Sequence, residues 1–71
     1  MAGTVTKDGL ASGLAAERAA FAERLRARGQ PETEVARRVS RLTLVHAEEV
    51  TLYGFPDLAQ ELRTLAAGTP R

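Results

Sequence analysis

Two glycine–x–proline breaks divide the 71-residue chain into three segments. The first break is Gly29-Gln30-Pro31 and the second is Gly54-Phe55-Pro56. A glycine just past a helix can adopt the left-handed conformation that closes it, and proline is tolerated in the first turn of the next helix, where its missing N–H would have no partner. The breaks therefore predict three helices, over about residues 10–28, 31–53 and 56–67.

Apolar residues recur at helical spacing within each segment. A helix that packs on a core carries apolar side chains every three to four residues along one face. The three stripes are Leu10, Leu14, Phe21 and Leu25 in the first segment, Val35, Val39, Leu42, His46, Val50 and Tyr53 in the second, and Leu58, Leu62 and Leu65 in the third. No stretch alternates with the period of two that indicates a strand. We therefore expect an all-α fold, a three-helix hairpin bundle with a long second helix that is the longest of the three.

Both ends of the chain lack this periodicity. Residues 1–9 are mostly small and polar, and residues 68–71 follow the last apolar residue of the third segment. We expect flexible tails at 1–9 and 68–71 around one helical domain at 10–67. The second helix should close in a Schellman turn, with Phe55 packing back on Val50.

Composition excludes several classes of site. The chain has no cysteine, so disulfides, thiolate metal sites and cysteine nucleophiles are excluded. No stretch approaches the roughly 18 consecutive apolar residues of a spanning helix, and the first residues lack the basic start and apolar run of a signal peptide. We expect a cytoplasmic protein without a membrane partner or cofactor. Its many arginines and alanines are typical of a GC-rich bacterial genome.

His46 is the only histidine, and it falls within an apolar stripe. A general base or a nucleophile needs a partner, yet on the same helix only Glu49 lies within reach, and one such pair does not form a metal site. We therefore interpret His46 as a core residue. The chain is not expected to be an enzyme, and no catalytic, metal or cofactor site is predicted.

Charges separate along the chain, although the net charge is only +1. Arginines gather near the first loop, and acidic residues gather toward the other end of the second helix. A basic pole can contact phosphate, so a small nucleic-acid-binding transcriptional regulator that uses Arg37, Arg38 and Arg41 is an alternative function. A solvated face explains the same residues, because no aromatic residues are interleaved for base stacking.

Three apolar residues of the second segment lie off its stripe, namely Leu44, Val45 and Leu52. A helix that is apolar on more than one side is covered on more than one side, by its neighbours or by another chain. A domain of this size also has a small core and little stability to spare. We therefore predict an interface of Leu44, Val45, Glu48 and Leu52. Its partner would be a second copy, whose dimerisation completes the bundle, or a larger signalling protein.

The stretch "RLTLVHAEEVTLYGFPDLAQELRTLA" resembles the histidine-containing phosphotransfer (HPt) domains of bacterial signalling relays. In that family an active helix carries the phosphoacceptor histidine, a lysine or similar residue three positions later and a glycine four positions later. The helix ends in an apolar or aromatic residue, a glycine and an "FP-x-L" entry to the next helix. Here "LYGFPDLAQELRTLA" is similar to that ending, and "ERAAFAERLRARGQPETEVARRV" is similar to the preceding helix and loop.

The residues that carry phosphotransfer do not follow the family pattern. Counting back ten residues from Gly54, the acceptor position holds Leu44, the basic position holds Ala47 and the glycine position holds Glu48. His46 lies two residues late, about 200° around the helix. Glu48 would also repel the acidic phosphorylation site of a receiver domain. The resemblance therefore implies a domain without transfer, a non-catalytic interaction or dimerisation module that is regulatory in bacterial signalling.

Overall fold

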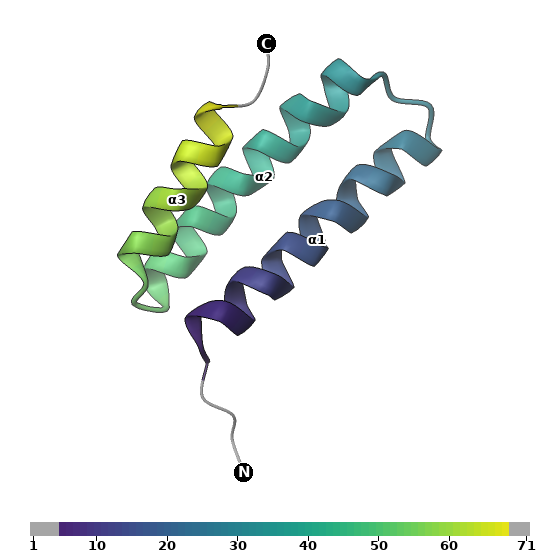
Figure 1. Cartoon of the computed structure of the whole chain (residues 1–71). Coiled ribbons are helices and arrows are strands. Elements are labelled where there is room, and N and C mark those ends of the chain that lie inside the picture. Colours follow the sequence, from purple (N-terminus) through teal and green to yellow (C-terminus); the bar gives the residue numbers. More distant parts are fainter. Residues whose placement is uncertain (1–4, 69–71) are drawn as a thin grey trace.

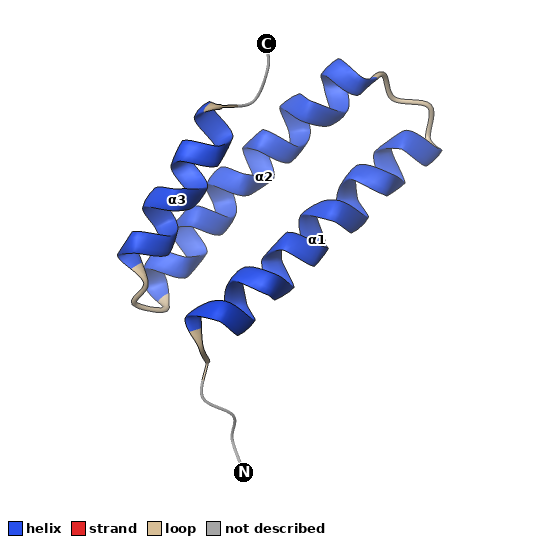
Figure 2. Ribbon diagram, viewed as in Figure 1, coloured by secondary structure: helices blue, strands red, loops and turns tan. Residues whose placement is uncertain are grey.

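The computed structural model describes residues 5–68, which form three α-helices joined by two short loops (Figure 1). The helices are α1 (Lys7–Ala27), α2 (Glu32–Leu52) and α3 (Pro56–Ala67). No strand occurs within residues 5–68, as Figure 2 shows. The predicted all-α, three-helix architecture is thus confirmed. Because α1 and α2 each contain 21 residues, the prediction that the second helix is the longest is wrong. Residues 1–4 and 69–71 of the predicted tails lie outside the described part.

The first two helices end at the glycines that the sequence predicts. Gly29 and Gly54 have φ angles of 82° and 92°, in the left-handed region that glycine adopts without strain. After α2, the Phe55 N–H donates to the Val50 carbonyl oxygen at 2.9 Å, and the Gly54 N–H donates to the Thr51 carbonyl oxygen at 3.0 Å. Phe55 also packs against the core cluster that contains Val50. The predicted Schellman turn and its apolar contact are confirmed.

α1 begins three residues earlier than predicted. Thr6 is its N-cap, and the Thr6 Oγ1 accepts a hydrogen bond from the Gly9 N–H at 3.0 Å. The Lys7 Nζ lies 3.0 Å from the Asp57 Oδ2 in the first turn of α3 and 3.5 Å from the Glu61 Oε2 one turn later. The cap and the ion pairs hold this turn, so its residues belong to the helix rather than to the predicted tail.

The core has two parts that follow one another along α2. At the C-terminal half of α2 all three helices meet, and the buried residues are Leu14, Ala47, Val50, Leu58, Ala59 and Leu62. Toward the first loop, Ala22, Leu25 and Val35 form a second cluster between α1 and α2. α3 is short, and Figure 1 shows it beside the C-terminal part of α2. Near its end the Ser40 Oγ donates to the Ala66 carbonyl oxygen at 3.1 Å.

Two residues of the predicted stripes are exposed instead of buried. Tyr53 lies beyond the last turn of α2 as its C-cap, and it is 53% exposed. On α3 the small residues Ala59 and Ala66 face the core, and this rotation leaves Leu65 on the flank with 56% of its surface exposed. Leu65 was predicted to be buried because it is the larger apolar residue. Close packing between helices instead favours the small side chains of the two alanines.

The helices lie in a thin layer, with principal extents of 42 × 26 × 14 Å. The shortest extent is little more than the 10–12 Å diameter of one helix with its side chains. Each helix therefore keeps an uncovered side, and for α2 this is the side opposite the core. None of the described helices is both long enough and apolar enough to cross a bilayer.

Candidate interaction surface

The buried side of α2 holds His46, whose side chain is almost completely buried. The Arg18 Nη1 of α1 lies 3.1 Å from the His46 Nδ1. A guanidinium can only donate, so Nδ1 accepts and the neutral ring carries its hydrogen on Nε2. The Glu17 Oε2 lies 3.5 Å from this Nε2, beyond hydrogen-bond length, and Nε2 has no hydrogen-bond partner within residues 5–68. The prediction that His46 is a core residue is confirmed.

The polar neighbours of His46 come from α1 and were not identified in the sequence. Arg18 lies four residues after Leu14 and seven before Leu25, inside the apolar stripe of α1. One sequence signal could have indicated this contact, namely an arginine within the apolar stripe of α1 together with a histidine within the apolar stripe of α2. Desolvation by burial lowers the pKa of Arg18, and the charge of Glu17 acts in the opposite direction. No group of three or more potential metal ligands occurs in the described part of the chain.

The opposite side of α2 carries the predicted interface residues. Leu44, Val45, Glu48 and Leu52 are all exposed, and Leu52 is the extreme case, with 87% of its surface exposed. Val45 and Leu52 are seven residues apart and therefore share one stripe, whereas Leu44 lies about 100° from Val45. The outer face of α2 consists of Arg38, Arg41, Val45, Glu48, Glu49 and Leu52.

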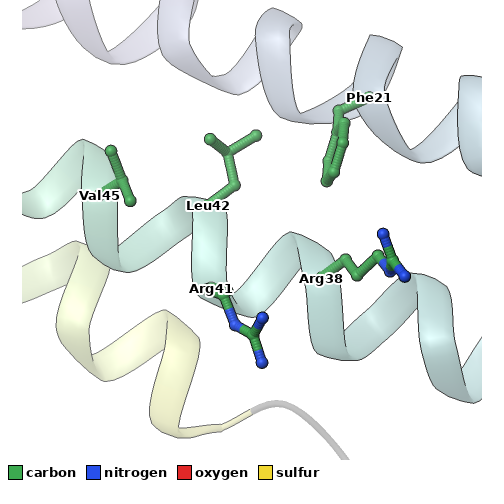
Figure 3. A pocket seen from close by; sticks show the side chains of 5 residues that line it. All are labelled: Phe21, Arg38, Arg41, Leu42 and Val45. Atoms are coloured by element: carbon green, nitrogen blue, oxygen red, sulfur yellow. The ribbon is translucent and has the colours of Figure 1, made fainter.

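A groove of about 260 Å³ opens between α1 and α2 beside this face (Figure 3). It is lined by Phe21, Arg38, Arg41, Leu42 and Val45. Figure 3 shows that Phe21 on α1 and Leu42 on α2 both point into the space between the two helices. The Arg24 guanidinium lies 5.9 Å from the centre of the Phe21 ring, a cation–π contact. The groove is therefore apolar inside and basic at its edges.

The three arginines predicted as an anion contact differ in their partners. Glu34 accepts hydrogen bonds from Arg38 at 2.8 Å and from Arg37 at 3.2 Å. The hydrogen bond from Arg38 is the main reason that the pKa of Glu34 lies below its usual value. Arg41 has no carboxylate within ion-pair distance in residues 5–68. Glu34 thus forms ion pairs with two residues of this basic cluster, and Arg41 acts on it only through longer-range charge.

Two acidic residues lie on the other side of Val45. Glu48 and Glu49 are exposed, and neither forms an ion pair within the described residues. The outer face of α2 is therefore basic in its first half and acidic in its second half. Because the chain itself does not satisfy these charges at close range, they are available to a partner.

The positions assigned by the HPt resemblance also lie on both sides of α2. The acceptor position, Leu44, is 47% exposed, and Glu48 is exposed as well. Ala47, at the position of the basic residue, is 1% exposed beneath α3, where a long cationic side chain has no room. Comparison of the chain with protein-family models, curated proteins and solved structures gave no significant match.

Proposed function

We propose that this chain is a non-catalytic helical interaction module that self-associates through the exposed side of α2. The observation that carries the proposal is the exposure of Val45 and Leu52 on one stripe, beside the apolar groove. Burying one leucine contributes about 1.5–3 kcal/mol. A two-fold contact counts every residue twice, so these side chains can together offset the free-energy cost of association.

We place this module in bacterial signalling because of its resemblance to HPt domains. An HPt domain transfers phosphate through an exposed histidine, whereas His46 is buried and Leu44 holds the acceptor position. The role that this pattern supports is docking or dimerisation within a larger regulatory system, without phosphoryl transfer. The exposed leucines would then hold the module to its partner.

The alternative of nucleic-acid binding through Arg37, Arg38 and Arg41 has weaker support. Glu34 bonds two of the three arginines, and the acidic half of the outer face would repel a phosphate backbone. Salt distinguishes the two functions. Binding to phosphates should weaken steeply as salt rises from about 50 to 200 mM, whereas apolar self-association should change little.

Sedimentation equilibrium tests the proposed self-association. We expect the wild-type chain to be a dimer at micromolar concentration and Leu52→Glu to shift it toward monomer. Leu65→Glu is the matched control, because Leu65 is also an exposed leucine but lies on α3. This control should remain dimeric. A wild-type chain that sediments as a monomer throughout the micromolar range would contradict the proposal.

A further inference from the structure

We infer that two copies pair antiparallel through the outer face of α2, with a two-fold axis near Val45, so that Leu52 of each copy enters the α1–α2 groove of the other. This inference rests on the proposed self-association and specifies its geometry. Apolar and charged residues follow one another along this face in an order that a two-fold axis can match, and the groove lies at one end of that order.

Leu52 and the Arg38 end of the groove lie at matching distances from Val45. Leu52 is seven residues after Val45, and Arg38, which lines the groove, is seven residues before it. At 1.5 Å per residue both lie about 10 Å from Val45 along the helix. A two-fold axis perpendicular to α2 at Val45 therefore brings the most exposed apolar side chain of one copy over the groove of the other. Each copy then contributes its Leu52 and receives the Leu52 of the other copy in its groove. An interface in which both chains use the same surface in this way is isologous.

The groove has the chemistry to receive a leucine. Phe21 and Leu42 both point into the space between α1 and α2 (Figure 3), and the groove's volume of about 260 Å³ exceeds that of one side chain. The Arg38 guanidinium is already held by Glu34, so its aliphatic stem can cover the incoming leucine. Insertion would remove Leu52 from water without leaving a polar group unsatisfied.

The charges of the face obey the same symmetry. Arg41 lies four residues before Val45 and Glu49 lies four residues after it. The proposed axis places Arg41 of one copy opposite Glu49 of the other, twice per dimer, with Glu48 only one residue, about 1.5 Å along the helix, from the same arginine. None of these three residues has an ion-pair partner in the described part of its own chain. A parallel pairing would instead place arginine on arginine and glutamate on glutamate, which disfavours it.

Charge reversal tests which residues meet. Arg41→Glu and Glu49→Arg should each raise the dimer dissociation constant at least about tenfold, because each brings like charges together twice. An equimolar mixture of the two variants should form a heterodimer with roughly wild-type affinity, because the first chain then carries two glutamates and the second carries two arginines at the paired positions. Native mass spectrometry identifies the heterodimer. Both positions are exposed, and circular dichroism of each variant checks that its helices persist.

Cysteine crosslinking tests the orientation, because the chain has no cysteine of its own. Leu52→Cys and Arg38→Cys chains are mixed and treated with a short bis-maleimide. The antiparallel pairing predicts crosslinks between the two different variants. Crosslinks joining two Leu52→Cys chains would indicate a parallel pairing and overturn the inference.

The outcomes separate the inference from the proposed function. A wild-type dimer whose two charge-reversal variants fail to restore each other refutes this pairing but leaves self-association intact. A wild-type monomer refutes both. A wild-type dimer, with restoration in the mixture and crosslinks between positions 38 and 52, supports both.

Discussion

At the scale of single residues, the most unusual feature is a polar contact inside a small apolar core. The His46 Nδ1 accepts from Arg18, while the His46 Nε2 is buried without a hydrogen bond within residues 5–68. A hydrogen bond to a charged group contributes about 1.5–3 kcal/mol, and an unsatisfied buried N–H costs about 1–3 kcal/mol. The two effects are of similar size, so the contact contributes more to fixing how α1 faces α2 than to net stability.

Removing only one member of this pair should therefore be harmful. Arg18→Met leaves both ring nitrogens of His46 without partners, and we expect it to lower the free energy of unfolding by about 1–3 kcal/mol. Adding His46→Leu removes the unsatisfied ring and should restore wild-type stability or exceed it. Urea unfolding measures the free energy of unfolding of the single and the double variant. Arg63→Met, at an exposed position, is the control. If the double variant is less stable than Arg18→Met alone, His46 has a role beyond this contact.

A phosphorylation assay tests the expectation that this chain does not carry phosphate on histidine. Phosphoramidate, a small phosphoryl donor, should leave the wild-type protein unlabelled, because the His46 ring is almost completely buried and its Nδ1 is bonded to Arg18. Leu44→His is the positive control, because it places an imidazole at an exposed position on the opposite side of α2. Acid-labile phosphate is measured by phosphorus NMR or intact mass. Label on wild-type His46 would show that α1 opens away from α2.

At the scale of elements, the sequence predicts where helices stop better than which way they face. The loops at Gly29 and Gly54 were predictable because a positive φ favours glycine at those sites. The facing of α3 was not, because packing on α2 selected Ala66 over the larger Leu65. The early start of α1 depends on contacts between Lys7 and α3, fifty residues away in sequence, which no local pattern contains.

The ion pairs that join α1 to α3 predict a pH dependence. The hydrogen bond with Lys7 lowers the pKa of Asp57 from 3.8, so this stabilisation is complete above pH 3.8 and is lost as the pH falls through the lower, folded-state pKa. The same bond raises the pKa of Lys7 from 10.5, so its contribution is complete below pH 10.5 and is lost as the pH rises through the higher value.

Lys7→Met should therefore lower Tm slightly between pH 3.8 and 10.5 and have almost no effect near pH 2. Differential scanning calorimetry at both conditions measures the difference from wild type. Asp57→Asn should behave similarly, and combining the two variants should add little. An equal loss of Tm for Lys7→Met at neutral and acid pH would mean that Lys7 acts through packing and not through charge.

At the scale of the whole molecule, the thin layer of helices explains why α2 carries surplus apolar residues. The exposure of Leu44, Val45 and Leu52 was predictable from their positions off the core stripe. The groove beside them was not, because it needs Phe21 of α1 to lie opposite Leu42 of α2. The separation of charge along α2 was visible in the sequence. The sequence alone could not show that these charges and the groove lie on the same face of α2.

Self-association through this face should make thermal stability depend on concentration. A dimer that binds only folded chains stabilises them by mass action, so the wild-type Tm should rise with protein concentration. Leu52→Glu removes the contact, so its Tm should not depend on concentration. Its Tm should also be lower than that of the wild type, by about 4–8 °C for each kcal/mol lost in a domain of this size. Leu65→Glu carries the same change on α3 and should keep the concentration dependence. Calorimetry from about ten micromolar to about one millimolar follows this rise at and above the micromolar concentrations at which we expect the dimer. If the wild-type Tm does not change over that range, the monomer is the stable unit and the exposed side of α2 is not covered by a second copy.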